Sequence, residues 1–519
     1  MAFIKSFKSQ QWLLPPSIEE LIPSDHVCFL IESLVDSIDF SPFEIKYSGA
    51  GHPAYHPKVI LKPMLMGVMD NIRSSRKIAR SIKENIVYMH LAEKLTPDFR
   101  TISDFRKNNP DLVKKLFKHT VILAKQEGML NMSCFATDGT KIKANSSDRK
   151  VLNKNELKFL MGFIDNELEK WSKQDSLEDD FFQKIRGSDE LPEKNKRKMK
   201  KIVEHYIKTG KEEGIKFKRK TKKTLEKVQK EHNDNKELDK VSMTDTDSHF
   251  MKNKKGRIEL SYNPQITTEK NGFVVANDVC KSASDMKQLK PQVMQTEENL
   301  GDLPEGIKWL VDKGYCSGNN IHFLNEKNID GYIPVIEQGK KDYDKCNFSY
   351  DEKNDEYICP ENKRLIFIRE EYNGHKKCDL RIYKGNECLT CSKIKECVHQ
   401  KIIRSRYIRM YPYESEKIKM KENMQTDEAR EMCKIRQRTV EPVFGNIKEN
   451  KGIRSFLLRG LENVKTEFNF VCAAVNLRKI HNLLQNKKYA MRNVVQKMKE
   501  NAECCVKIGL GQNMSDLFV

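Results

Sequence analysis

The stretch Cys134-Phe-Ala-Thr-Asp-Gly-Thr-Lys-Ile-Lys-Ala-Asn145 leads a short apolar run directly to a carboxylate, Asp138, and then to a glycine. An apolar run that ends in Asp-Gly is typical of a buried strand that stops at a turn, so the acid is expected at the strand's end, open to solvent. A hard divalent cation such as Mg²⁺ prefers carboxylate oxygens held in such a place. An ordinary Asp-Gly turn explains the same residues, and for this stretch taken alone it is the commoner case.

The same pattern recurs at Ile307-Lys-Trp-Leu-Val-Asp-Lys-Gly-Tyr315, where an apolar run ends in a second acid, Asp312, with a glycine close behind. Between the two stretches, residues 257–279 contain strand signals that predict an antiparallel meander with the Asp138 strand as its first member. Residues 331–335 predict a further strand. Two strands of one sheet that each end in an acid favour a shared metal site more than either acid does alone.

A third acid, Glu441, lies in the stretch Gln437-Arg-Thr-Val-Glu-Pro-Val-Phe-Gly-Asn-Ile-Lys448. Its apolar residues recur at helical spacing and predict a helix over 427–450, with Glu441 beside the apolar face. Arg438 precedes this acid by about one turn and Lys448 follows it by about two, so the acid and the bases could contact a single phosphate. A solvent-exposed glutamate on a surface helix is the alternative.

Composition and charge restrict the class of protein. The chain has 519 residues, of which 38% are hydrophobic, which is enough for several domains or for one domain with large insertions. The net charge of +20 favours a polyanionic partner, nucleic acid first and an acidic membrane surface second. Because no run of about 18 apolar residues and no signal-peptide core occurs, we expect a cytoplasmic protein without a membrane partner.

Residues 1–130 are predicted to be helical. One helix is expected to start at Ser75, and two short helices joined by Asn71-Ile-Arg-Ser74 resemble a helix-turn-helix. In that arrangement Arg76 and Lys77 would contact DNA. A small helical bundle with solvated charges explains the pattern equally well.

Two segments interrupt the predicted sheet. Residues 147–243 begin as an amphipathic helix and are then dense in Lys and Glu, which predicts a basic helical insertion. Residues 339–410 contain a Cys-x-x-Cys pair with further thiols nearby, a spacing that suits a structural zinc site. Reduced cysteines in a loop are the alternative, since strong zinc signatures have two such pairs. The predicted Zn²⁺ ligands are Cys359, Cys388, Cys391 and Cys397.

Taken in order, these motifs resemble those of bacterial insertion-sequence transposases of the DDE type. Within the clan of insertion sequences four and five, they look most like the group numbered eleven eighty-two. The matching pieces span nearly the whole chain, and their order makes the resemblance specific. They are Gly51-His-Pro-Ala-Tyr-His-Pro57, Thr96-Pro-Asp-Phe-Arg-Thr-Ile-Ser-Asp-Phe-Arg106, Thr137–Asn145, Val311–Tyr315, Cys388-x-x-Cys391 with Cys397, Val440–Lys448 and Asn476-Leu-Arg-Lys479.

The resemblance implies an α/β fold with a ribonuclease-H-like mixed sheet flanked by helices. It implies that Asp138, Asp312 and Glu441 form the catalytic triad and hold Mg²⁺ or Mn²⁺ for phosphoryl transfer. One departure concerns the phosphate-binding arginine. The clan expects arginine four residues before the glutamate, where this chain has Gln437, while Arg436 and Arg438 flank that position.

The resemblance also implies a domain organisation, with a separate role for each part of the chain. Residues 1–130 would bind the DNA ends, residues 131–146, 244–338 and 411–490 would form the catalytic domain, and 147–243 and 339–410 would be a basic helical and a cysteine-rich insertion, with 491–519 as a tail. The expected partners are the terminal inverted repeats and target DNA, bound by a homodimer at the bacterial nucleoid. Two alternatives are a catalytically silent DNA-binding repressor or domesticated relative, and a zinc-containing RNA-binding or structural protein.

Overall fold

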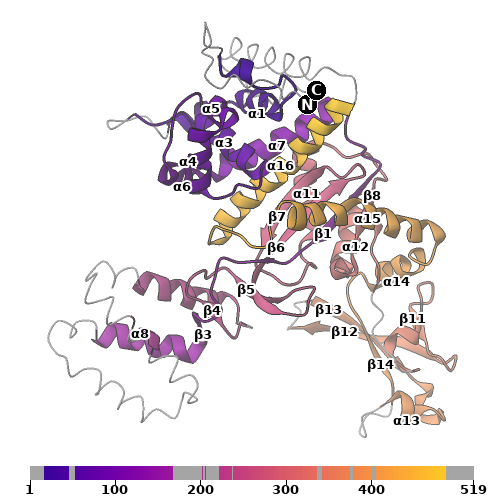
Figure 1. The fold of residues 1–519 in the computed structure, drawn as a ribbon. Coiled ribbons are helices and arrows are strands. Elements are labelled where there is room, and N and C mark those ends of the chain that lie inside the picture. The colour runs from indigo at the N-terminus through magenta and orange to yellow at the C-terminus, as the bar shows by residue number, and fades with distance from the viewer. Residues whose placement is uncertain are drawn as a thin grey trace, which may run out of the picture.

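A mixed seven-stranded sheet forms the centre of the part of the chain that the structure describes (Figure 1). The order of the elements confirms the predicted mixed α/β architecture and its N-terminal helical region. Most of the predicted basic insertion lies outside the described residues. The structure is a computed structural model that describes residues 17–45, 53–167, 201–202, 205, 221–236, 238–335, 342–374, 378–398 and 405–486.

The strand order places β1 in the middle of this sheet. Strand β1 pairs antiparallel with β6 and parallel with β8, and β8 pairs parallel with β9. The meander expected from the sequence is present, because β6 pairs antiparallel with both β1 and β7, and residues 258–269 form its long central strand. The strands are β1 (Cys134–Gly139), β2 (Ile142–Lys143), β5 (His249–Lys252), β6 (Ile258–Glu269), β7 (Val274–Cys280), β8 (Lys308–Val311) and β9 (Asp330–Tyr332).

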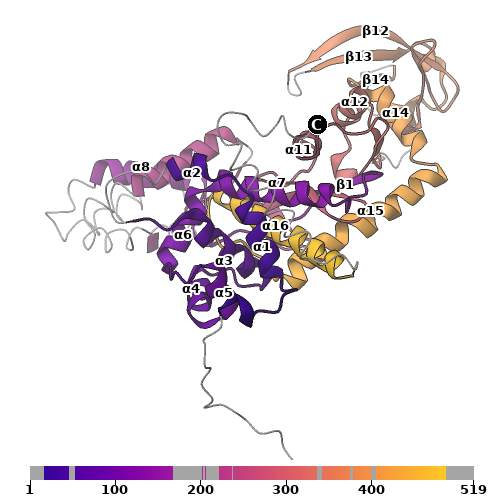
Figure 2. The same cartoon turned by 90° about the horizontal axis from the view of Figure 1, so that it is seen from above.

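The N-terminal helices and the sheet share one hydrophobic core, whose residues range in sequence from Ile22 to Leu484. Helix α16 (Leu461–Asn486) connects them, since it packs against α3, α7 and β7 (Figures 1 and 2). Buried Asn476 on α16 accepts a hydrogen bond from Val274 N–H (2.9 Å) and donates one to the Val274 carbonyl (2.8 Å). The helices of this region are α1 (Val27–Asp36), α2 (Ser41–Glu44), α3 (Pro57–Met69), α4 (Ser75–Glu84), α5 (Ile86–Leu91), α6 (Phe99–Asn108) and α7 (Pro110–Gln126).

The described part of the basic insertion is a small unit with its own core. Strands β3 (Val151–Leu152) and β4 (Val241–Ser242) pair at its base, and α8 (Lys154–Glu167) extends from it. A second helical segment, 221–234, packs there through buried Leu225 and Val228. Helix is therefore present where the sequence predicted it.

The cysteine-rich segment forms a five-stranded antiparallel sheet, which the sequence analysis did not predict. Its longest pair, β12 and β13, projects beyond the other described elements in Figure 2. The strands are β10 (Ser349–Asp351), β11 (Glu356–Ile358), β12 (Arg364–Asn373), β13 (Cys378–Gly385) and β14 (Tyr407–Met410), and the short helix α13 (Ile394–Cys397) lies between β13 and β14.

The remaining helices surround the central sheet. Helix α11 (Leu289–Leu300) contacts β6 and β7, and α15 (Asp427–Gly445) crosses β1, β6, β8 and β9. Helices α12 (Gly318–Glu326) and α14 (Glu414–Asn423) pack against each other. None of the described helices combines the length and the apolar character needed to cross a membrane.

Candidate active site

Asp138 and Asp312 follow two neighbouring parallel strands. Thr137 of β1 lies opposite Val311 of β8, so the next residue on each strand is an acid. Because paired strands lie about 4.8 Å apart, the two acids are side by side at one edge of the sheet. Each carboxylate also accepts a hydrogen bond from the next backbone N–H, that of Gly139 at 2.8 Å and that of Lys313 at 2.7 Å.

Glu441 reaches the same region from α15, through an arginine. Arg436 Nη1 lies 3.5 Å from Asp138 Oδ2, and its Nη2 lies 3.3 Å from Glu441 Oε1. The Arg436 side chain is only 13% exposed, and its Nη1 is buried without a hydrogen-bond partner among the described residues. Arg438 is 75% exposed and lies 4.0 Å from Glu431. Of the two arginines that flank the expected position, Arg436 therefore faces the acids.

At Asp138 the effect of burial on the carboxyl pKa outweighs that of the nearby positive charges. Burial raises the pKa of this carboxyl to about 6, and the charge of Asp312 raises it further, although Arg436 and the Gly139 N–H act in the opposite direction. A buried carboxylate with too few partners favours its protonated form. A cation placed between Asp138 and Asp312 would stabilise the charged form of both carboxylates.

Two lysines lie beside the acids. Lys448 is in the π-helical turn Asn446–Asn450 that follows α15, and its Nζ donates to Thr140 Oγ1 and to the Lys141 carbonyl. Burial lowers the pKa of Lys448, Lys254 lowers it further, and Asp138 raises it. Lys254, exposed in the β5–β6 turn, also lowers the pKa of Asp138. The sequence analysis missed Lys254, because lysine in a hairpin turn is too common to be a signal.

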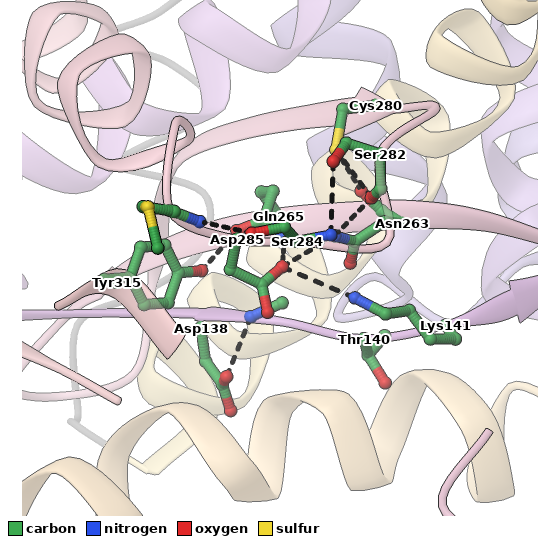
Figure 3. A network of polar contacts seen from close by, with 12 residues as sticks. Asp138, Thr140, Lys141, Asn263, Gln265, Cys280, Ser282, Ser284, Asp285 and Tyr315 are labelled. Atoms are coloured by element: carbon green, nitrogen blue, oxygen red, sulfur yellow. Dashed lines mark hydrogen bonds and ion pairs between the residues drawn. The ribbon is translucent and has the colours of Figure 1, made fainter. Parts of the chain in front are cut away.

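A further carboxylate, Asp285, lies behind β1, on the opposite side of the strand from Asp138 (Figure 3). Its Oδ1 accepts hydrogen bonds from Asn263 (2.6 Å) and Gln265 (2.8 Å) of β6 and lies 3.4 Å from Lys141 Nζ. Buried Gln265 in turn accepts a hydrogen bond from the Tyr315 hydroxyl. This network joins the turn after Asp138, strand β6 and the turn after Asp312.

Gly139 leaves room for the Gln265–Asp285 pair. A Cβ on Gly139 would lie 2.1 Å from Gln265 Nε2 and 2.8 Å from Asp285 Oδ1, whereas one on Gly314 would make only an ordinary contact with Asp285 Oδ2 at 3.5 Å. The sequence analysis used these glycines as turn signals and did not select Asp285. No local pattern marks this residue, because its partners come from strands distant in sequence.

Arg76 and Lys77 are both exposed on α4. The Arg76 guanidinium lies 5.0 Å from the centroid of the Phe99 ring on α6. Helix α3, which precedes α4, is almost entirely buried in the core. Within the described residues, no recorded contact joins either basic residue to the three acids, so they belong to a separate surface.

The four cysteines predicted to bind zinc line one cavity of about 20 Å³. Cys359 Sγ accepts the Lys363 N–H at 3.2 Å, and Cys388 Sγ accepts the Arg406 N–H at 3.4 Å. Cys391 directly follows the 3₁₀ turn Glu387–Thr390, and Cys397 ends α13. Cys388, Cys391 and Cys397 are close in sequence, and the fold brings Cys359 from β11's end to the same cavity.

Neither group of residues is assembled as a metal site. Within the residues that the structure describes, no three His, Cys, Asp or Glu side chains are grouped closely enough to hold a metal ion. For the acids, the Arg436 guanidinium stands between Asp138 and Glu441. The donor chemistry nevertheless fits, because carboxylate oxygens suit Mg²⁺ or Mn²⁺ and thiolates suit Zn²⁺.

Comparison with known families finds two matching segments. Residues 16–108 match a family described as a transposase domain (DUF772), and residues 358–481 match one described as a transposase DDE domain. Both matches are to transposases. The second segment contains Glu441 and Lys448 but neither Asp138 nor Asp312, and no curated protein matches the chain. Two segments of the chain are thus similar to transposase domains, as the motifs predicted.

Proposed function

We propose that the protein is a DDE transposase of the insertion-sequence group numbered eleven eighty-two. It would bind the terminal inverted repeats of a mobile element as a homodimer, cleave the DNA ends and join the freed 3′-hydroxyl to target DNA. The observation that carries this proposal is the parallel pairing of β1 and β8, which sets Asp138 beside Asp312 beneath the helix that carries Glu441. The similarity of two segments to transposases supports it.

The three acids would hold Mg²⁺ or Mn²⁺. When bound, these ions lower the pKa of an attacking water and stabilise both the attacking and the leaving oxygen. Arg436 has a buried Nη1 without a hydrogen-bond partner among the described residues, so it can donate to a phosphate oxygen. By turning to the phosphate, Arg436 would release Asp138 and Glu441 for the metal.

The other basic residues would bind DNA at increasing distance from the cut. Lys448 is fixed beside Asp138 by Thr140 and the Lys141 carbonyl, which suits it to neutralise the scissile phosphate. Exposed Arg438 would contact the adjoining backbone. Arg76 and Lys77 on α4 would bind the repeats.

The domain division follows from the same proposal. Residues 131–146, 244–338 and 411–490 would form a ribonuclease-H-like catalytic domain, and the mixed order of its central sheet supports this. Residues 147–243 and 339–410 would be insertions. Residues 1–130 would recognise DNA ends while sharing the core of the catalytic domain.

The test compares acid variants on DNA that carries the flanking repeats. With Mg²⁺ present, Asp138→Asn, Asp312→Asn and Glu441→Gln should each lose cleavage by about a thousandfold or more, because each would remove a metal ligand. DNA binding should remain. Glu449→Gln is the matched control, since Glu449 is an exposed acid of the next turn that pairs with Arg454.

Each outcome of this assay separates the candidates. Strand cutting that survives the three acid substitutions contradicts the assigned site. A parent protein that binds the repeats and never cuts them is instead a silent repressor or domesticated relative on the same scaffold.

For the cysteines, the proposal is one structural Zn²⁺ per chain. The shared cavity and the two N–H donors to sulfur support it, because such donors stabilise thiolates. Elemental analysis of the purified protein should find zinc, and the Cys388→Ser, Cys391→Ser double variant should lose it. Cys346→Ser is the control, since Cys346 does not line the cavity. Unchanged zinc in the double variant, or none in the parent, excludes the site.

A further inference from the structure

A groove of about 300 Å³ lies where the β6–β7 turn meets α15 and α16. Its cationic lining residues are Lys270, Arg438, Arg478 and Lys479, accompanied by three asparagines, and none of the described residues that line it is acidic. Such a concentration of one sign of charge in a concave surface attracts an anion. The basic residues that act with the proposed metal ligand Asp138 are Arg436, Lys254 and Lys448, and none of these three lines the groove.

The β6–β7 turn is shaped to hold one of these cations in place. Gly272 has φ +79°, and a Cβ at this position would lie 2.9 Å from Lys479 Nζ. Lys479 instead lies across the turn, where it donates to the Asn271 carbonyl and sits 5.1 Å from the centroid of the Phe273 ring. Its ammonium is therefore fixed before any ligand arrives.

The acid nearest to this turn is directed elsewhere. Glu269 is fully buried, and its carboxylate accepts N–H groups from Asn131 (2.7 Å), Asn271 (2.9 Å) and Phe273 (2.9 Å). Three backbone N–H donors hold its oxygens. Burial lowers the pKa of Lys479, and the charge of Glu269 opposes this shift. The groove is thus left with more positive than negative charge.

The position of the groove identifies its ligand. Arg438 and Pro442 line it, and Glu441 lies between them on α15. A helix with its side chains is about 10–12 Å across, so the groove lies within about one helix diameter of the proposed catalytic glutamate. Successive phosphates of one DNA strand are about 3.4 Å apart along the helix axis, so a strand cut at the acids would bring neighbouring phosphates here.

We propose that this groove binds a backbone phosphate of the DNA strand that is cut, close to the scissile phosphate. Lys270, Arg478 and Lys479 gain a DNA-binding role that the sequence motifs did not assign to them. The proposal rests on the transposase function proposed above and specifies how the substrate lies across α15 and α16.

The first experiment measures DNA affinity against salt concentration without Mg²⁺, using the Lys270→Gln, Arg478→Gln double variant. Loss of one phosphate contact should reduce the slope of log affinity against log salt by about one, equally for repeat and unrelated DNA. Affinity should fall about tenfold at moderate salt. The Lys287→Gln, Lys353→Gln double variant removes the same charge from exposed positions outside the groove and should keep the parent slope.

The second experiment locates the phosphate. Neutral methylphosphonates replace the phosphates around the cut one at a time. At one or two positions the replacement should weaken binding by the parent about tenfold and leave binding by the groove variant unchanged, because that contact is already absent. Equal thermal midpoints of parent and variant would show that the fold is intact.

The outcomes distinguish this proposal from the proposed function. If the groove variant keeps the parent salt slope, or if no methylphosphonate position affects parent and variant differently, the groove does not bind the backbone, whatever the acid variants do. If the slope and position effects appear in a protein that never cuts, the groove is supported and the nuclease assignment fails.

Discussion

Asp138 at the end of β1 and Glu231 at the base of the basic insertion are both largely buried carboxylates with cations nearby, and their pKa values move in opposite directions. Glu231 interacts with His249 (2.9 Å), Lys281 (2.7 Å) and Asn235 (2.7 Å). Burial raises its pKa, but the hydrogen bonds from His249 and Lys281 outweigh burial and bring it to about 2. Asp138 has one N–H and a guanidinium nitrogen at 3.5 Å, and its pKa rises to about 6.

The difference separates a carboxylate whose charge is paired in the fold from one that we propose holds a metal ion. Glu231 joins helix 221–234 to His249 of β5 and to Lys281, which follows β7. Its low pKa adds stability above pH 4.5 that is lost as the pH falls toward 2. Asp138 does the reverse, since its raised pKa makes the folded state less stable once the pH passes from about 4 to above 6. Under the proposed function, a cation bound at Asp138 would offset this loss of stability.

The largest expected effect comes from removing the charge at Asp138. Asp138→Asn should lose cleavage by about a thousandfold or more, and yet be more stable than the parent without metal at pH 7.5. The rise from 3.8 to about 6 corresponds to about 3 kcal/mol of unfolding free energy. Denaturant unfolding in EDTA at pH 7.5 and at pH 4 measures this, and the gain should disappear at pH 4. If Asp138→Asn is instead less stable than the parent at pH 7.5, the charge of Asp138 does not destabilise the fold and the contrast with Glu231 is wrong.

The opposite change is expected at Glu231. Glu231→Gln should lower the unfolding free energy by up to about 3 kcal/mol at pH 7, because the charge that pairs with Lys281 and His249 is gone. Hydrogen exchange of the 221–236 amides would report the loss locally. Glu226→Gln, an exposed acid on the same helix, should change little. If Glu231→Gln and Glu226→Gln change the unfolding free energy equally, the ion pairs of Glu231 do not stabilise this part of the fold.

A smaller effect is expected at Asp285, which positions the Asp138 turn from behind. Asp285→Asn should lower cleavage about tenfold and raise the Mg²⁺ concentration needed for half-maximal cleavage, because carboxylates that orient metal ligands act through metal affinity. Titration of cleavage with Mg²⁺ tests this, with exposed Asp302→Asn as control. A rate loss that leaves the Mg²⁺ requirement unchanged would assign Asp285 to general stability alone.

The sequence was sufficient for what is local. The strands that end at Asp138 and Asp312 and the helix that begins at Asp427 are marked by apolar runs, turn glycines and helical spacing, and all occur as predicted. Helix α15 gives way to a π-helical turn at Asn446, within the stretch predicted as one continuous helix. The choice between Arg436 and Arg438 was also within reach, because Arg436 precedes buried Val440 by four residues and shares its helical face.

Features that depend on contacts between residues distant in sequence could not be predicted from local patterns. The parallel contact of β1 with β8 joins residues separated by a whole insertion, and Asp285 gains its role only once β6 lies beside β1. The cysteine-rich sheet was missed because β12 is largely exposed and carries charged residues on both faces, so it has no clear hydrophobic alternation.

The shared core has a consequence for biosynthesis. Chains emerge from the ribosome from the N-terminus onward, and β7 stays partly uncovered until α16 has been made. Glu441 also arrives late, long after the strands that carry its two partner acids. A chain made only as far as β8 thus lacks both Glu441 and the helix that completes the core, so under the proposed function it could not yet cut DNA.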